Sequence, residues 1–379
     1  KYILHKVNGT SIITGMALDP NNNNRIWYID PLNKFLGAFD INTRTNQNYK
    51  VQSQGPISGI AVESTSGNNG VDNTNKSKVW ITLPSDNSVL KFDSQNKNFT
   101  KYSLPTPNAG PLGIAIDSDD GLVWVAEGGS GKIASIDPNK NYKITEYEPN
   151  NNSSSSSLGS YKNGSSLKSP TALLIDPDTD NIYITEHDGH AITMFDPILK
   201  TFKRYSGLDP KGLPFGMAFD SYHNIWVAEH VINKISVIDP RTGVHKEVNI
   251  PARNPFAQWL TSDSSGNIWF AEQRSNALGV IKQSLNPLQS SPNSAGSTSP
   301  SSSQSNTKNN SSSNNNDIPQ LGFSYADVVG PTVALGIIFS VIIYTRSVIS
   351  LKQSQHVVSS IKSKHDEHNN NSQNNNRKI

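Results

Sequence analysis

The chain has 379 residues, of which 34% are hydrophobic and 17% charged, and its formal net charge is +2. A charge so close to neutral gives no broad basic field, so we expect no nucleic-acid partner. The absence of cysteine excludes disulfides, thiolate nucleophiles and zinc–thiolate sites. This polar composition fits either extensive disorder or an all-β fold whose apolar residues lie in short strands.

The first predicted strand is Lys1–Val7 (KYILHKV), which resembles two later segments, Phe99–Leu104 (FTKYSL) and Ile144–Pro149 (ITEYEP). Because the chain begins at Lys1 rather than at Met, we expect that a signal peptide was cleaved or that an upstream part is missing.

Six segments then repeat one pattern, in which a short apolar run is followed by a polar turn and a strand that carries an aromatic residue. The fifth repeat shows four strands in order: Gly216–Asp220, Asn224–Glu229, Lys234–Asp239 and His245–Ile250. Repeats of about 40–45 residues with four strands each predict a β-propeller. We interpret the repeated aromatic residues as packing between neighbouring blades. They are Trp27, Trp80, Trp124, Tyr183, Trp226 and Trp269.

Closure of the ring requires a fourth strand for the sixth repeat, which has a third strand at Leu278–Gln283 and then becomes polar. We expect Lys1–Val7 to supply that strand, which predicts an all-β, six-bladed β-propeller over residues 1–285. A missing upstream part would allow a seventh blade.

The C-terminal part of the sequence predicts a membrane anchor. Residues 286–325 are rich in Ser, Asn and Pro and are expected to form a disordered stalk. A transmembrane helix is predicted over 326–351, because Val328–Tyr344 is free of charge and long enough to span a bilayer. Positive residues follow it, so residues 352–379 are expected to form a cytoplasmic tail. The prediction is a single-pass type I protein with an extracellular propeller.

Two of the repeats share a recognisable sequence motif, GPLGIAIDSDDGLVWVAEGGSGKIASIDP (Gly110–Pro138) and LPFGMAFDSYHNIWVAEHVINKISVIDP (Leu213–Pro240). This motif resembles the repeats of streptogramin B lyases, also called virginiamycin B lyases, and more loosely those of the NHL-repeat propellers. The resemblance covers roughly Lys1–Gln283. It implies a ring of seven blades that opens a cyclic depsipeptide antibiotic by elimination.

In that family a histidine acts as the base, and a Mg²⁺ ion held by glutamates polarises the ester. The base stands in a Pro-His-Gly/Ala-Ile motif where the first strand of a blade begins. The matching residue of the sixth repeat is Phe256 if the Pro-x-Ala motif is aligned, or Gln258 if the spacing to Asp263 is kept. None of the matching positions holds histidine. The other five are Thr14, Ser58, Leu112, Thr171 and Phe215.

A second group of residues could still form a site, because the starts of first strands and the ends of second strands open on the same face of a propeller. Glu127, Glu186, Glu229 and Glu272 end second strands, and His187 and His230 follow two of them, with His190 close by. Carboxylate and imidazole ligands suit Mg²⁺ or another divalent cation, so the predicted metal ligands are Glu186, His187, Glu229 and His230. The alternative is that the repeated glutamates bond the backbone of the adjacent blade.

The segment Asp176–Asn181 (DPDTDN) is similar to a calcium loop, but His187 stands where the bidentate glutamate is expected, so we interpret it as a turn. The predicted function is a membrane-anchored extracellular module that binds a ligand or protein, because the catalytic histidine of the family is absent. The alternative is an enzyme, either a carbon–oxygen lyase or a metal-dependent, lactonase-like hydrolase, that acts at the channel mouth.

Overall fold

The computed structural model describes residues 13–22, 24–64, 76–149, 166–250, 256–263, 266–272, 277–282, 287–288 and 323–326. The chain divides into two units, residues 1–329 and 330–379, and all of the described residues belong to the first.

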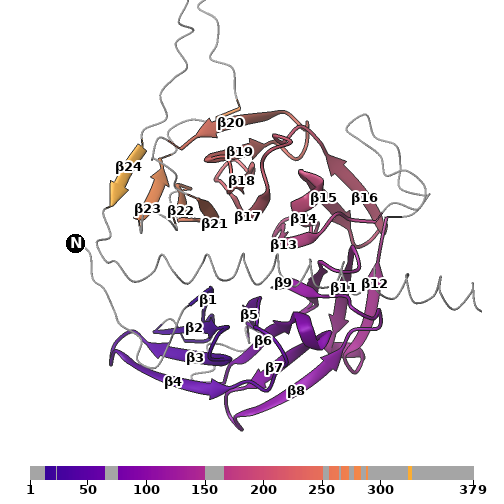
Figure 1. Ribbon diagram of the computed structural model, residues 1–379, viewed down its shortest axis with the longest axis vertical. Helices are drawn as coiled ribbons and strands as arrows, with labels where there is room; N and C mark the ends of the chain where they lie inside the picture. Colours follow the sequence, from indigo (N-terminus) through magenta and orange to yellow (C-terminus); the bar gives the residue numbers. More distant parts are fainter. Residues whose placement is uncertain are drawn as a thin grey trace, which may run out of the picture. The chain divides into compact units, whose positions relative to one another are not determined.

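The described residues form six antiparallel sheets of four strands, which confirms the six-bladed, all-β prediction (Figure 1). Blade 1 contains β1 (Gly15–Leu18), β2 (Arg25–Asp30), β3 (Phe35–Asp40) and β4 (Thr45–Lys50), and blade 2 contains β5 (Ile60–Val62), β6 (Lys78–Leu83), β7 (Ser88–Asp93) and β8 (Asn98–Ser103). Blade 3 contains β9 (Pro111–Ile116), β10 (Val123–Glu127), β11 (Lys132–Asp137) and β12 (Lys143–Tyr147), and blade 4 contains β13 (Pro170–Ile175), β14 (Ile182–Glu186), β15 (Ala191–Asp196) and β16 (Thr201–Tyr205). Blade 5 contains β17 (Pro214–Phe219), β18 (Ile225–Glu229), β19 (Lys234–Ile238) and β20 (His245–Asn249), and blade 6 contains β21 (Ala257–Ser262), β22 (Ile268–Glu272), β23 (Ala277–Ile281) and β24 (Phe323–Ala326).

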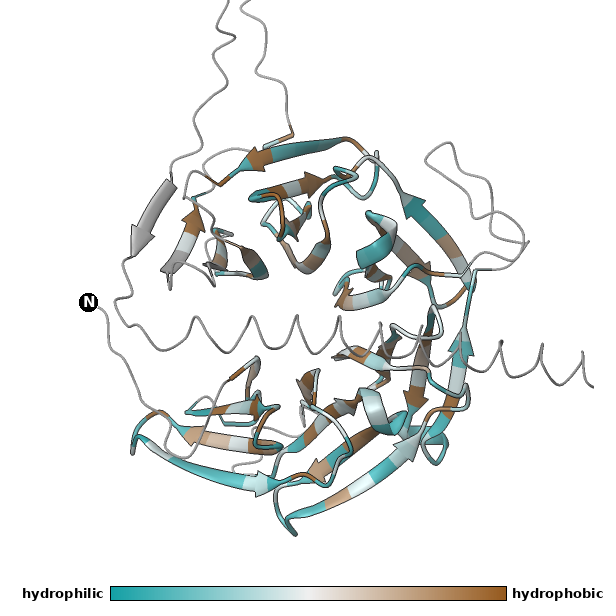
Figure 2. Cartoon of the chain, in the orientation of Figure 1, coloured by the Kyte–Doolittle hydropathy of each residue, from teal (hydrophilic) through white to brown (hydrophobic). Residues whose placement is uncertain are grey.

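The strands are short because Asp and Asn residues end them in tight turns. The carboxylate of Asp40 accepts the N–H of Asn42 at 3.0 Å, and that of Asp196 accepts the N–H of Ile198 at 2.9 Å. Such side-chain bonds offer the backbone an alternative to the strand ladder, so the chain reverses there. The hydrophobic residues gather on the inner strands, whereas the turns and outer strands such as β4 and β8 are mostly hydrophilic (Figure 2).

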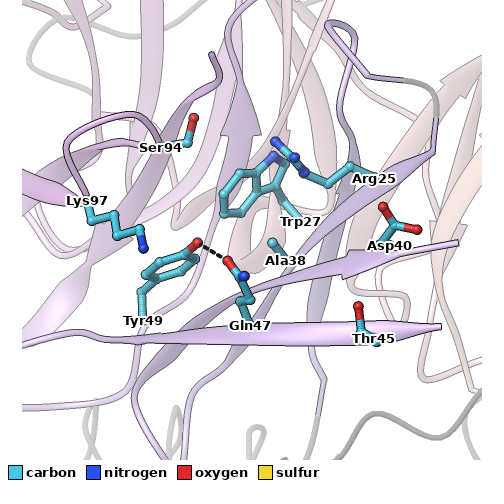
Figure 3. A pocket seen from close by; sticks show the side chains of 9 residues that line it. All are labelled: Arg25, Trp27, Ala38, Asp40, Thr45, Gln47, Tyr49, Ser94 and Lys97. Carbon is cyan, nitrogen blue, oxygen red and sulfur yellow. Dashed lines mark hydrogen bonds between the residues drawn. The ribbon is translucent and has the colours of Figure 1, made fainter. Parts of the chain in front are cut away.

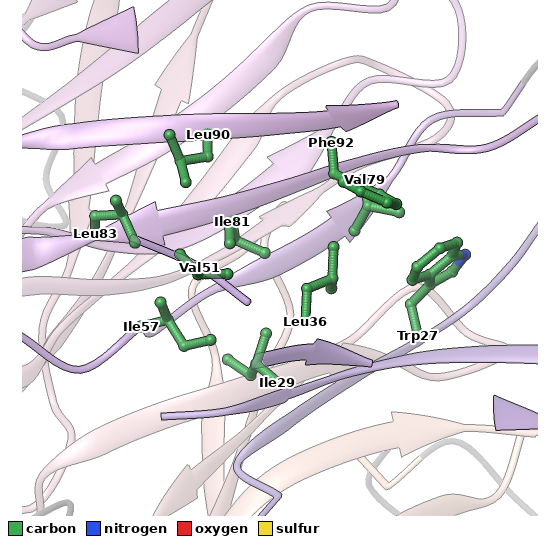
Figure 4. Close-up of a cluster of buried hydrophobic side chains, with 10 residues drawn as sticks. All are labelled: Trp27, Ile29, Leu36, Val51, Ile57, Val79, Ile81, Leu83, Leu90 and Phe92. Carbon is green, nitrogen blue, oxygen red and sulfur yellow. The ribbon is translucent and has the colours of Figure 1, made fainter. Parts of the chain in front are cut away.

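The hydrophobic core lies between the blades. Trp27 and Leu36 of blade 1 are buried against Val79, Ile81 and Phe92 of blade 2 in one cluster (Figure 4). The rings of Trp27 and Phe92 meet edge to face, with their centres 5.7 Å apart. This burial confirms that the repeated aromatic residue packs adjacent blades together.

Trp27 is also held by a hydrogen bond to an aspartate in the turn between the first and second strands of its blade. The indole N–H of Trp27 donates to Asp19 at 2.9 Å, and Trp226 and Trp269 donate in the same way to Asp220 and Asp263. The aspartate at the end of the first strand therefore orients the core aromatic residue of its own blade.

The blades follow one another around the ring, since β1, β5, β9, β13, β17 and β21 contact each other in succession. In blade 6, β24 is hydrogen-bonded to β23, although Phe323–Ala326 falls where the predicted stalk meets the predicted helix. An exposed strand edge leaves backbone groups without partners, and β24 satisfies them. Lys1–Val7, which was expected in this place, lies outside the described residues.

Among the residues that the structure describes, none forms a helix with the length and hydropathy of a membrane span. The predicted span Val328–Tyr344 lies outside these residues, so the membrane anchor stays a prediction.

Candidate functional site

The starts of the first strands lie beside the ends of the second strands, as predicted. Pro170 pairs with Glu186 in blade 4, and Pro214 pairs with Glu229 in blade 5. The register shifts directly after each proline, so the next one or two residues leave the regular ladder. Irregularities of this kind often re-aim side chains at functional sites.

This register decides which residue of blade 6 matches the start of the other first strands. Ala257 pairs with Glu272 just as Pro214 pairs with Glu229, so Gln258 is the equivalent of Phe215. The sequence alone left Phe256 and Gln258 open. The structure therefore places Gln258 in the position of the family's base in blade 6.

Two histidines from neighbouring blades come together on this face. The ring centres of His187 and His230 are 5.3 Å apart, and Phe215 lies 5.7 Å from His230. Phe256 packs on His230 at 4.8 Å, while Trp259 meets Phe215 edge to face at 4.9 Å. We call these five residues the channel-mouth cluster. His230 is only 3% exposed, whereas Trp259 is 44% exposed, so the cluster runs from a buried histidine to an open aromatic surface.

His187 is oriented by its neighbours. Its Nδ1 lies 2.9 Å from Asp188 Oδ1, and Ser169 Oγ donates to the other carboxylate oxygen of Asp188 at 2.6 Å. The backbone N–H of His187 donates to Ser169 O at 3.1 Å. A carboxylate at Nδ1 favours the tautomer that carries hydrogen there. Asp188 and the backbone of Ser169 therefore fix the orientation of the His187 ring.

The glutamates at the strand ends are held inside their own blades. Glu186 is fully buried, and its carboxylate accepts hydrogen bonds from Thr193 at 2.7 Å, Arg204 at 3.0 Å and the backbone N–H of Lys168 at 2.8 Å. Lys168 belongs to the segment that leads into blade 4. Glu186 therefore bonds a backbone N–H, but in the segment that leads into its own blade and not in the adjacent blade that the structural alternative named.

Glu127 and Glu229 are also fully buried but have fewer partners. Ser130 Oγ donates to Glu127 at 2.6 Å, and Ser236 donates to Glu229. The remaining oxygens, Glu127 Oε1 and Glu229 Oε2, have no hydrogen-bond partner among the described residues. Burial raises the pKa of Glu127 to about 7, and it raises the pKa of Glu229 as well. The pKa rises in both cases because burial removes the carboxylate from water and so disfavours its charged form.

The other predicted site residues are less central. His190 Nδ1 bonds the carbonyl oxygen of Gly212 in the segment before blade 5, which is a structural role. Glu272 ends β22, and the structure describes its backbone only. In the described part of the chain, the predicted ligands Glu186, His187, Glu229 and His230 do not form one convergent group of ligating atoms. Their role in binding a metal stays a prediction.

The group that does converge is Asp176, Asp178 and His223, on the opposite face. His223 Nε2 lies 2.9 Å from Asp176 and its Nδ1 lies 3.5 Å from Asp178, so the histidine itself bridges the two carboxylates. Asp176–Asn181 also forms the turn between β13 and β14, in agreement with our interpretation of that segment.

Sequence reasoning found both histidines of the channel-mouth cluster but not its aromatic walls or Asp188. A usable signal was present, because Asp188 directly follows His187, and Phe215 stands at a position that had already been compared with the family's base. The contact between Phe215 and Trp259 joins two blades, so only the packed ring reveals it.

Fold and geometry together define a six-bladed β-propeller in which histidine and aromatic side chains of blades 4, 5 and 6 cluster on one face. No protein-family model matches the sequence, and no curated protein matches it. Its fold is similar to that of streptogramin B lyase, at 21% identity, with a TM-score of 0.58 over 72% of this chain and 80% of the lyase.

Two further solved structures share this fold. Catalytically inactive virginiamycin B lyase from Staphylococcus aureus with quinupristin is 19% identical, with a TM-score of 0.61 over 74% of this chain and 84% of that chain. An auxiliary nutrient binding protein from Bacteroides thetaiotaomicron is 12% identical, with a TM-score of 0.50 over 70% and 67%. At these identities the similarity establishes the fold, and the resemblance to streptogramin B lyase that the sequence suggested holds at that level.

Proposed function

We propose that this protein is a membrane-anchored, extracellular β-propeller that binds a ligand at the channel-mouth cluster. The observation that carries the proposal is the convergence of His187 and His230 with Phe215 and the exposed Trp259. Aromatic walls bind apolar or planar groups, and imidazoles add hydrogen bonds that fix their orientation.

A binding role fits the residues at the starts of the first strands. Leu112, Thr171, Phe215 and Gln258 occupy the positions where the resemblance implies a catalytic histidine. The fold is compatible with binding alone, since the similar fold from Bacteroides thetaiotaomicron belongs to a nutrient binding protein. The charge-free stretch Val328–Tyr344, followed by Arg346 and Lys352, supports the membrane anchor.

Quinupristin is a suitable probe, because it is the compound present with the virginiamycin B lyase of similar fold. The full-length protein, purified in detergent, is titrated with quinupristin while tryptophan fluorescence is recorded. We expect saturable binding that Trp259→Ala weakens at least tenfold. Ile198→Ala, which removes an 81%-exposed apolar side chain from a turn on the opposite face, is the matched control and leaves binding unchanged. Absence of saturable binding, or equal losses in both variants, would contradict the proposal.

A second candidate is favoured by one observation, the contact of His187 with Asp188. In an elimination, His187 would take the proton from the carbon next to a carbonyl while the ester C–O bond breaks. The electron pair of the C–H bond forms the new double bond, the carboxylate leaves, and Asp188 stabilises the imidazolium. Chromatography of the same mixtures separates the two functions. Ring-opened quinupristin that disappears in His187→Ala indicates a lyase, and unchanged quinupristin indicates binding alone.

A further inference from the structure

A cavity of about 390 Å³ lies between blades 1 and 2, at the ends of the strands opposite to the channel-mouth cluster (Figure 3). Blade 1 contributes Arg25, Ala38, Gln47 and Tyr49 to its wall, and the turn between β7 and β8 contributes Ser94 and Lys97. Neither the resemblance nor the proposed function involves these residues.

The cavity exists because a small residue stands opposite the core tryptophan of blade 1. Ala38 is the cross-strand partner of Trp27, whereas the equivalent partner of Trp80 in blade 2 is Lys91. The ammonium group of Lys91 lies 5.7 Å from the centre of the Trp80 ring and bonds the hydroxyl of Tyr142. The partners in all five other blades have at least one more heavy atom than Ala38. They are Lys91, Ser135, Met194, Val237 and Val280.

Two cations, Arg25 and Lys97, and one carboxylate, Asp40, line the cavity. The guanidinium of Arg25 lies over the Trp27 ring, 5.7 Å from its centre, and Lys97 stands on the opposite side of the cavity. The one lining carboxylate, Asp40, accepts the N–H groups of Asn42 and Thr43, at 3.0 and 2.8 Å, so its charge is spread over its own turn. Arg25 also lies 3.6 Å from the buried Asp19, so its charge is shared with that carboxylate, and Lys97 is the second cation of the lining.

The remaining lining groups are neutral and polar. Thr45 and Ser94 carry hydroxyl groups, and Gln47 carries an amide whose oxygen accepts the hydroxyl of Tyr49 at 2.7 Å. Guanidinium and ammonium groups recognise carboxylates and phosphates, while hydroxyls and amides recognise hydroxyl groups. The combination suits a ligand that carries both kinds of group.

We propose that this inter-blade cavity binds a small hydroxylated organic anion of about the size of an acidic monosaccharide. Its carboxylate lies between Arg25 and Lys97, and its hydroxyl groups contact Thr45, Gln47 and Ser94. The site is separate from the channel-mouth cluster and does not depend on the function proposed for it.

Isothermal titration calorimetry of the full-length protein with D-glucuronate, and with D-glucose as the neutral analogue, tests this site. We expect saturable binding of glucuronate and at least tenfold weaker binding of glucose, because glucose lacks the carboxylate. Arg25→Gln and Lys97→Gln should each weaken glucuronate binding about tenfold. Ala38→Met should abolish it by filling the cavity, and blade 4 already accommodates a methionine at this position as Met194.

Lys50→Gln is the matched control, since it also removes one positive charge from blade 1. Lys50 bonds the carbonyl of Asn33 at 2.7 Å and does not line the cavity. Unchanged affinity in Lys50→Gln, together with losses in the three cavity variants, supports the site. The proposal is overturned if glucuronate does not bind, if glucose binds equally well, or if Lys50→Gln loses as much affinity as Lys97→Gln. Lys97 is exposed, so its replacement keeps the test valid even if Arg25→Gln impairs folding.

Discussion

Blades 4 and 5 share one backbone template, but they distribute their polar contacts differently at both ends of the second strand. In blade 5, Asp220 accepts the indole N–H of Trp226 within the same blade at 2.8 Å. Blade 4 has Tyr183 in place of tryptophan, and its Asp176 accepts instead from His223 of blade 5 at 2.9 Å. One change of aromatic residue accompanies a shift from a contact within a blade to a contact between blades.

The other end of the strand shows a similar contrast. Glu186 in blade 4 meets Arg204, whereas Glu229 in blade 5 and Glu127 in blade 3 meet single hydroxyl groups. The residue and its burial are the same, but only Glu186 has a cationic partner within the described ranges. The comparison shows that the repeat sets the position of a side chain, while the neighbouring residues set its polar partners.

The largest expected effect comes from removing the cation of blade 4. Arg204→Met leaves the fully buried Glu186 without its positive partner and should lower the free energy of unfolding by about 3–5 kcal/mol. Urea denaturation measures the loss. Lys234→Met is the control in blade 5, because Lys234 bonds the partly exposed Asp209 and Glu247 and should cost about 1 kcal/mol or less. Similar losses in the two variants would remove the contrast between the blades.

The stability of the protein should depend on pH through Glu127 of blade 3. The pKa of Glu127 is raised to about 7, so the folded state binds more protons than the unfolded state between pH 4.5 and 7. Stability from this group is therefore present below pH 4.5 and is lost as the pH rises through 7, by about 3 kcal/mol in total. Thermal melting of Glu127→Gln against the wild type should show a flatter slope over this range. An unchanged slope would mean that the pKa of Glu127 is the same in the folded and the unfolded state.

A smaller effect tests the aspartate contacts. Trp226→Phe removes the donor to the buried Asp220 and should cost about 2 kcal/mol. His223→Ala should cost about 1 kcal/mol, since the His223 side chain is 32% exposed and Asp176 keeps the N–H of Asp178 at 2.9 Å. Chemical denaturation compares the two variants. If His223→Ala costs more than Trp226→Phe, the contact between blades is the stronger one.

The smallest expected effect on stability comes from Asp188, whose side chain is 59% exposed. Asp188→Asn should change the free energy of unfolding by less than about 0.5 kcal/mol. It should nevertheless alter the tautomer of His187, which ¹⁵N NMR of the imidazole reports. An imidazole spectrum identical to that of the wild type would show that Asp188 does not orient His187.

The all-β propeller could be predicted from the sequence, because a repeated aromatic strand bounded by turn residues is a local pattern with one stable arrangement. The position of the face that holds His187 and His230 could also be predicted, since alternating strand directions fix which ends of the strands lie together. The partners of Glu186 could not, because Thr193 and Arg204 lie on other strands and meet the carboxylate only when the blade is packed.

By itself, the sequence determined the number of visible repeats and the strands of each blade, except for the fourth strand of blade 6, which the structure places at Phe323–Ala326. Periodicity and turn chemistry act over a few neighbouring residues, so they can be read along the chain. Only the tertiary structure decided that Gln258 matches Phe215, that Trp259 packs against Phe215, and that Ala38 stands beside a cavity where blade 2 has Lys91. These features depend on register and on contacts between blades, and such contacts join residues that are distant in the sequence.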